Sequence, residues 1–168
     1  MLVYHPAFDI YNCVFRMLQL LTAMKQHEVE LDRLRIWDFY LTFPNEARKI
    51  KFPTALSELK KVFKQKDENP YEDLIDAKKI IERMKPYQIE ALHCLASYGL
   101  IEAKSLSKNL IVRTEKELPQ ELLENFENIS TEKLNIIKLV IGFAELPLYG
   151  QMGLKYRTGL IEFRYDER

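Results

Sequence analysis

The residues best suited to chemistry lie near the end of the chain, where glycines flank two cations and a hydroxyl. Lys155, Arg157 and Thr158 follow Gly153 closely, and glycine turns with a lysine and a hydroxyl are the ingredients of a phosphate-binding loop. The spacing is not that of a Walker A loop. The run from Gly150 to Gly153 matches the four-residue loop of KH domains, but without the flanking fold that this module needs. We therefore interpret the segment as two turns that present cations to a partner, and not as a nucleotide site.

The residues that follow these turns alternate in the manner of a β-strand. Ile161, Phe163 and Tyr165 fall on one face, and charged residues fall between them. Such a strand could close the protein's own sheet or add to the edge of a partner's sheet. We predict that residues 147–168 form a C-terminal docking segment with a strand tail. Since aromatic, apolar and arginine side chains dominate interface energetics, the predicted partner-binding residues of this segment are Tyr149, Met152, Leu154, Lys155, Tyr156, Arg157 and Phe163.

Other polar residues indicate no catalytic or metal site. The adjacent pair His93 and Cys94 would point about 100° apart on a helix, so the two side chains would not share an ion. Glu72, Asp73 and Asp76 are better explained as acids near a helix N-terminus, where the helix dipole stabilises them, than as catalytic carboxylates. The serines show no nucleophile-elbow pattern. We predict no catalytic residue, no metal and no cofactor.

Composition is typical of one soluble globular domain. The chain has 168 residues, 47% of them hydrophobic and 30% charged, which is enough for a sizeable core. Its formal net charge is zero, which removes the simplest argument for nucleic-acid binding. Cys13 and Cys94 are far apart in sequence and fit a reducing, cytoplasmic setting. The start of the chain lacks the features of a signal peptide, and no window reaches the roughly 18 apolar residues of a membrane span.

Apolar residues repeat at helical spacing over most of the chain. Tyr11 is expected to face inward in the first helix, and Leu134 and Ile141 in the last. Pro86 is expected to open a separate helix that ends at Gly99. Helices are predicted over residues 9–25, 30–43, a short stretch after 54, 70–84, 86–98, a stretch from about 119, and 131–146.

The second helix carries a polar face that also merits attention. Arg33, Arg35 and Asp38 lie away from its predicted core face. We predict them as weaker partner-binding candidates. Internal ion pairs, or a solvated face, are equally consistent with the pattern.

A helix followed at once by a β-hairpin predicts a winged helix. Residues 100–104 and 109–114 read as two short strands. The predicted fold is therefore mainly α with a small β-hairpin or sheet, a winged-helix-like single domain over residues 1–168. A DNA-reading helix before the wing would be rich in cations or amides. Residues 86–98 contain no lysine or arginine, and their expected exposed positions include Tyr87, Gln88, Glu90 and Ser97.

The sequence therefore favours a protein-docking module over a sequence-specific DNA reader. Two sets of cations could still contact a DNA backbone nonspecifically. The first lies in the predicted wing, at Lys104, Lys108 and Arg113. The second is the segment 46–66, which has seven basic and two acidic residues. Runs of charge of this kind are more often solvated faces.

Taken together, several stretches of the sequence resemble one known family. They are residues 8–12, 15–18, 31–44, 69–72, 88–92 and 153–160. In these stretches the chain resembles middle components of ABC-three-component systems. The resemblance spans most of the chain, and residues 46–66 and 115–132 carry little of it.

The resemblance implies an accessory subunit of Lamassu-type antiviral and antiplasmid defence. Such middle components accompany an SMC-like (Rad50-like) ATPase that senses DNA and an effector, often a nuclease. The family implies no chemistry for the middle component itself, which is thought to hold the effector quiet against the ATPase until foreign DNA is detected. No catalytic residue carries over from the family.

The expected function is thus a non-enzymatic adaptor between an SMC-like ATPase and a nuclease effector, with DNA at most contacted nonspecifically and no membrane partner. A winged-helix transcription regulator is the alternative, and it would bind one DNA sequence tightly. No group of residues supports the third possibility, a small enzyme. A metal or nucleotide retained through purification would indicate one.

Overall fold

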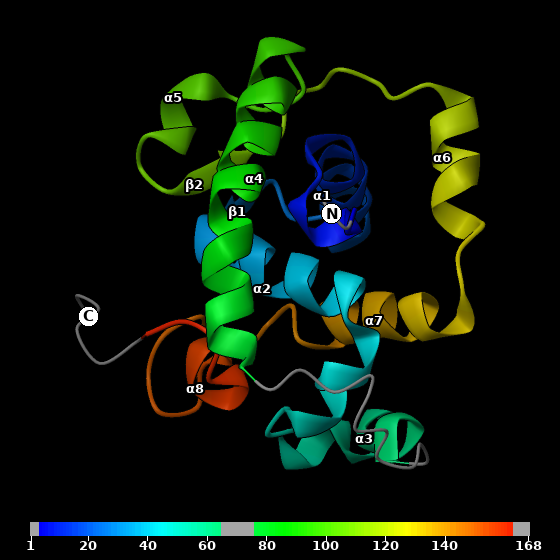
Figure 1. The fold of residues 1–168 in the computed structure, drawn as a ribbon, viewed down its shortest axis with the longest axis vertical. Coiled ribbons are helices and arrows are strands. Elements are labelled where there is room, and N and C mark those ends of the chain that lie inside the picture. The colour runs from blue at the N-terminus through cyan, green and yellow to red at the C-terminus, as the bar shows by residue number, and fades with distance from the viewer. Residues whose placement is uncertain (1–3, 65–75, 163–168) are drawn as a thin grey trace.

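The structure, a computed structural model, describes residues 4–64 and 76–162 and is mainly helical (Figure 1). The described α-helices are α1 (Ile10–Met24), α2 (Leu31–Thr42), α3 (Ser57–Lys64), α4 (Ala77–Ser97), α5 (Ala103–Leu106), α6 (Gln120–Glu127), α7 (Thr131–Gly142) and α8 (Leu154–Thr158). Three short 3-10 helices are η1 (Pro6–Phe8), η2 (Pro44–Lys49) and η3 (Thr54–Leu56), and the described strands are β1 (Glu28–Glu30) and β2 (Leu110–Val112). The expected fold class, mainly α with a small sheet, is confirmed.

Helix α1 is the central element of the fold, in contact with α2, α4 and α7 (Figure 1). Its predicted start is confirmed, since the Asp9 carboxylate accepts a hydrogen bond from the Asn12 backbone N–H at 2.8 Å. Cys13 and Met17 are fully buried, as a helix that is apolar around most of its circumference requires. Tyr11, expected to face inward, is 87% exposed. The apolar side chains on the same face of α1 as Tyr11 become less buried toward the N-terminal end of the helix, and Tyr11 lies in its first turn.

Helix α2 lies against α1, α4 and α7, so that even its charged residues are in the interior. Leu34, Trp37 and Leu41 are buried, as predicted, and the helix ends at Thr42, before Pro44. The Trp37 ring contacts the ring of Phe143 edge to face, with 5.5 Å between centroids. This contact joins α2 to the segment after α7.

Helix α4 differs from the prediction of two helices, because it continues through Pro86. Proline cannot donate to the carbonyl of Glu82, one turn earlier. Both residues are exposed, so water can satisfy that carbonyl and the helix need not end. The start of the described helix is capped by Asp76, which accepts a hydrogen bond from the Lys79 backbone N–H at 3.1 Å. Residues 70–75 of the helix predicted over 70–84 lie outside the described residues.

The predicted glycine end of α4 is confirmed. Gly99 has a φ of +73°, which an L side chain rarely adopts. The Leu100 N–H donates to the Leu95 carbonyl, and the Gly99 N–H to the Ala96 carbonyl, both at 3.0 Å. This is the Schellman arrangement of a helix C-terminus.

The small sheet pairs β1 with β2 in antiparallel register, with Val29 opposite Ile111. The sequence did not predict β1, which is only three residues long. The predicted hairpin forms in part: Ile101 bridges Arg113, but the residues that follow Ile101 turn into α5 instead of a strand. The order of helices and strands is compatible with a winged helix, which stays a prediction.

The predicted starts of α6 and α7 are confirmed, and Ser130 caps α7 by accepting from the Lys133 N–H at 3.3 Å. The predicted inward face of α7 is wrong at two positions. Leu134 is 40% exposed and Ile141 is 55% exposed. The helix has apolar residues on two faces, and the face with Ile136, Leu139 and Val140 is the one that packs into the core.

The C-terminal segment forms a helix, α8, where the sequence predicted a turn between glycines. Gly153 and Gly159 bracket α8, and residues 159–162 form no strand. Ile161 is half-buried beside the core. Phe163 and Tyr165, the rest of the predicted strand face, lie outside the described residues. Leu154 and Leu160 belong to the same hydrophobic cluster as α1, α2, α4 and α7.

Candidate functional site

Glycines shape the turns before and after α8, as the sequence indicated. Gly150 has a φ of +90° and Gly159 a φ of +64°, both in the left-handed region. Gly153 has a different reason for lacking a side chain, because a Cβ there would lie 2.3 Å from the carbonyl oxygen of Tyr149. The Leu154 N–H donates to the Pro147 carbonyl at 2.8 Å and closes the loop. The segment is therefore a tightly folded turn and helix.

Lys155 points into the protein, contrary to the expectation that it is presented outward. The residue is 2% exposed, and its Nζ lies 2.9 Å from Asp32 Oδ2. Arg35 Nη1 lies 3.2 Å from the other carboxylate oxygen of Asp32. Burial on its own would raise the pKa of Asp32, but the hydrogen bond and charge of Lys155, with Arg35, outweigh it and hold the pKa below its ordinary value. Lys155 thus ties the C-terminal segment to α2.

Arg157 is also buried, with 6% of its surface exposed. Its Nε donates to the Met152 carbonyl at 2.7 Å, and its Nη1 donates to the Lys51 carbonyl at 2.9 Å. The Lys51 N–H in turn donates to the Arg157 carbonyl at 2.9 Å. The two cations of the segment therefore hold it against the body of the protein, because Lys155 pairs with Asp32 and Arg157 bonds to the Lys51 carbonyl.

The polar residues of α2 form internal pairs, one of the alternatives that the sequence left open. Arg16 Nε lies 2.6 Å from Asp38 Oδ1. Gln88 Nε2 donates to Asp38 Oδ2 at 2.9 Å, and Arg35 Nε donates to Gln88 Oε1 at 2.9 Å. Gln88 was expected on the surface and is fully buried. This chain of contacts joins α1, α2 and α4 across the core.

Arg33 is held in the same way at the other side of α2. Its Nε lies 2.9 Å from Glu30 Oε1, and its Nη2 donates to the Leu146 carbonyl at 2.6 Å. Arg33, Arg35 and Asp38 are all at most 5% exposed. Their assignment as partner contacts stays a prediction, but they offer no open face to a partner in this structure.

Three predicted partner-binding residues do reach the surface. Tyr149 is 45% exposed, Met152 63% and Tyr156 38%. Lys51 Nζ lies 4.5 Å from the centre of the Tyr156 ring, a cation–π contact at the edge of the same segment. We call Tyr149, Met152, Tyr156 and Lys51 the C-terminal surface. Phe163, the remaining predicted residue, lies outside the described part of the chain.

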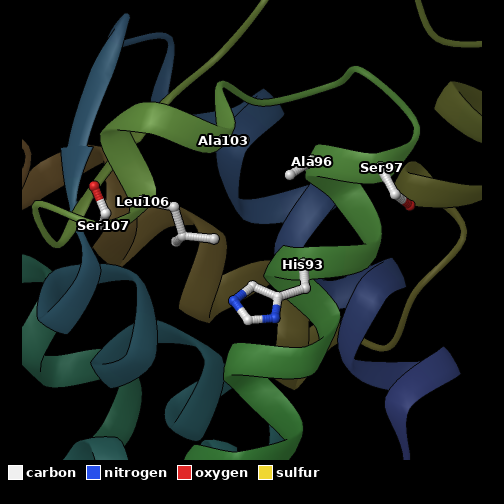
Figure 2. Close-up of a pocket in the computed structure, with 6 residues that line it drawn as sticks. All are labelled: His93, Ala96, Ser97, Ala103, Leu106 and Ser107. Atoms are coloured by element: carbon white, nitrogen blue, oxygen red, sulfur yellow. The ribbon is translucent and has the colours of Figure 1, made fainter.

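A separate pocket of about 470 Å³ lies between the end of α4 and α5 (Figure 2). His93 and Leu106 project into this space from the two helices. Glu90 Oε1 lies 3.8 Å from Nδ1 of His93. Within residues 4–64 and 76–162, no three potential metal ligands gather at one place. The polar side chains that line the pocket are His93, Ser97 and Ser107.

Comparison with known families decides the class of the protein. The profile of ABC-three component (ABC-3C) system Middle Component 5 matches residues 2–166, nearly the whole chain. The chain belongs to this family. A middle component works with the other components of its system, so partner proteins are expected. No curated protein and no solved structure is similar enough to match this middle component. Each helix that the structure describes is too short or too polar to cross a membrane.

Sequence reasoning missed the roles of two residues that pair with the predicted partner-binding residues. Asp32 receives Lys155, and Gln88 joins Arg35 to Asp38. Asp32 and Arg35 are one helical turn apart, which was a readable signal of an ion pair. No local signal marks Gln88, because its partners lie on another helix.

Proposed function

We propose that this middle component is a non-enzymatic, cytoplasmic adaptor in a Lamassu-type defence complex. It joins an SMC-like, DNA-sensing ATPase to a nuclease effector and keeps the effector inactive until the ATPase responds. The observation that carries the proposal is the C-terminal surface, an exposed group of two tyrosines and a methionine on a segment that buried cations fix in place.

The way this segment is fixed supports a docking role. An interface loses less conformational entropy on binding when its backbone is already ordered. Lys155 and Arg157 order the backbone from inside, while Tyr149, Met152 and Tyr156 stay accessible. Tyrosine is a frequent hot-spot residue, and methionine adapts its shape to a partner. A preformed apolar surface of this kind suits stable association with another protein.

The winged-helix regulator is less well supported. The part of α4 from position 86 to its end has no lysine or arginine to neutralise phosphates. Gln88, the residue there best able to read a base, is buried and bonded to Arg35 and Asp38. The cations on η2 and α3 remain a place where DNA could be contacted nonspecifically within the complex.

The proposal is tested by assembling the complex from purified components. The variant Tyr149→Ala, Met152→Ala, Tyr156→Ala removes the exposed side chains and leaves Lys155 and Arg157 in place. We expect it to fold normally and to lose co-purification with the ATPase or the effector. The control is Tyr11→Ala with Tyr98→Ala, two exposed tyrosines elsewhere on the surface. Normal assembly of the triple variant would contradict the docking role of this surface.

A further inference from the structure

Helix α6 lies along one edge of the molecule, far from α8 (Figure 1). Its main anchor is Phe126, which is 8% exposed and packs its ring against Phe15 with 5.1 Å between centroids. The Phe126 carbonyl accepts a hydrogen bond from Gln19 Nε2 at 2.8 Å. The last turn of α6 is thus fixed to α1, and Leu122 and Leu123 in the earlier turns are partly buried against the core.

A cleft of about 430 Å³ opens between α1, α6 and α7. Thr22 and Ala23 of α1 line it on one side, Leu123 of α6 on another, and Leu134 and Ile137 of α7 on a third. Most of this lining is apolar. A volume of this size holds a few large side chains, which suits the insertion of anchors from another protein segment.

The apolar face of α7 continues beyond the cleft. Leu134, Ile137 and Ile141 follow one another along one side of the helix. Leu134 is 40% exposed and Ile141 is 55% exposed, while the opposite face of α7 packs into the core. The three side chains of this stripe follow one another along the helix axis, as the side chains that line a helix-binding groove do.

Helix α6 is acidic, and Glu127 is among the residues that line the cleft. Residues 115–127 contain five glutamates and one lysine. Glu121, Glu124 and Glu127 are exposed on α6 itself, and the lysine, Lys116, donates to the Tyr98 carbonyl at the end of α4. On the α7 side, Lys138 is the exposed cation beside the stripe. The acids of α6 therefore set the charge that an incoming segment meets on that side.

We propose that this cleft binds an amphipathic helix of a partner protein, with apolar anchors on one face and lysine or arginine beside them. The anchors enter between α6 and α7, and the cations pair with the glutamates of α6. The site is distinct from the C-terminal surface, so the inference goes beyond the proposed function. Two docking surfaces on different sides would let one small protein hold two partners at once (Figure 1).

Charge reversal in the assembled system tests the electrostatic part of the proposal. The variant Glu121→Lys, Glu124→Lys, Glu127→Lys changes only exposed side chains. Affinity for the partner that uses the cleft should fall about tenfold or more, and the fall should be smaller at high salt. The matched control is Glu90→Lys with Glu102→Lys, exposed acids near the α4–α5 pocket, which should change affinity by about twofold at most. Equal effects of the two variants would overturn the proposal.

A photo-crosslinking amino acid at position 141 tests the apolar part, with position 11 as the control site. In the complex of all components, position 141 should crosslink to a partner peptide that has apolar residues at helical spacing and a net positive charge. A crosslink to a second copy of this chain, to an acidic or non-helical segment, or to nothing would overturn the proposal. Loss of binding in the Tyr149, Met152 and Tyr156 variant bears on the C-terminal surface alone, so the two surfaces fail or succeed separately.

Discussion

Lys155 and Arg157 carry positive charge into the interior, where each meets a different kind of acceptor. Lys155 pairs with a carboxylate of α2, and Arg157 spans two backbone carbonyls from separate segments. A buried cation is costly unless it is paired and hydrogen-bonded, so these contacts are what make the positions possible. Through these contacts, Lys155 and Arg157 determine the positions of the exposed side chains next to them.

The Lys155–Asp32 pair predicts a dependence of stability on pH. The pKa of Asp32 is lowered in the folded protein from its ordinary value of 3.8. Its contribution to stability is therefore complete above about pH 3.8 and is lost as the pH falls from there through the folded-state pKa. Asp32→Asn should cost about 1–2 kcal/mol at neutral pH and progressively less in acid. Urea unfolding of both proteins across this range checks the prediction, and parallel pH profiles would refute it.

Arg157 predicts a loss of stability when its two hydrogen bonds to carbonyls are removed. Arg157→Ala leaves the Met152 and Lys51 carbonyls without that donor, which should cost about 2–3 kcal/mol in the free energy of unfolding. Arg157→Lys should fall between the variant and the natural protein, since one ammonium cannot reproduce the arginine fork. Lys51→Ala is the control, because it removes an exposed side chain and keeps the carbonyl. Thermal unfolding measures all three, and equal effects at 51 and 157 would be the contrary result.

At the scale of elements, α8 and its flanking turns fix the C-terminal surface. Gly153 permits a close approach of two backbone segments, whereas Gly159 permits a left-handed turn. These are different physical requirements, and they give different costs when a methyl group is added.

Alanine at the two glycines separates these requirements. Gly153→Ala places a Cβ against the Tyr149 and Leu148 carbonyls, so the backbone must move, and we expect a loss above about 2 kcal/mol. In Gly159→Ala the added Cβ meets no atom within 4 Å. The only loss of stability is that of an L residue held at a positive φ, about 1 kcal/mol. Chemical denaturation of the two variants compares them directly. A larger loss at position 159 would contradict the turn geometry described for α8.

The elements also show where sequence reasoning works and where it stops. Caps at Asp9 and Ser130 and the glycine end of α4 at Gly99 were predictable, because local hydrogen bonds decide them. The continuation of α4 through Pro86 was not, since the Glu82 carbonyl that loses its partner is exposed to water and the helix need not end there. The strand predicted from Ile161 to Tyr165 lies mostly outside the described residues, so it stays a prediction, although residues 161 and 162 form no strand.

The candidate site was predictable in its residues but not in their orientations. The glycines, tyrosines and cations of residues 149–159 were recognisable as a special segment. Which of them face outward depends on Asp32 and on the carbonyl of Lys51, which are more than a hundred positions away in sequence. Periodicity within the segment contains no information about such long-range partners, so Lys155 and Arg157 were expected on the surface.

At the scale of the whole molecule, balanced charge predicts weak and nonspecific DNA binding by the isolated chain. The net charge is zero and the end of α4 lacks cations, so affinity for duplex DNA should be weaker than about 1 μM at physiological salt. It should show no sequence preference. Fluorescence anisotropy with several duplexes measures this. Tight binding to one sequence would favour the transcription-regulator alternative.

Two surfaces on one small helical body are a suitable arrangement for a middle component. The C-terminal surface and the α6–α7 cleft lie on different sides, with α1 and its neighbours packed between them (Figure 1). A continuous hydrophobic cluster joins α1, α2, α4, α7 and α8, so the position of one surface is set relative to the other.

The most direct test of the adaptor account is the equilibrium affinity of this protein for the purified ATPase and for the purified effector. The measurement compares the natural protein with the Tyr149→Ala, Met152→Ala, Tyr156→Ala variant. The account predicts that the variant keeps its thermal stability within about 1 kcal/mol and binds at least one partner about a hundredfold more weakly. Unchanged affinity for both partners in a correctly folded variant would contradict it.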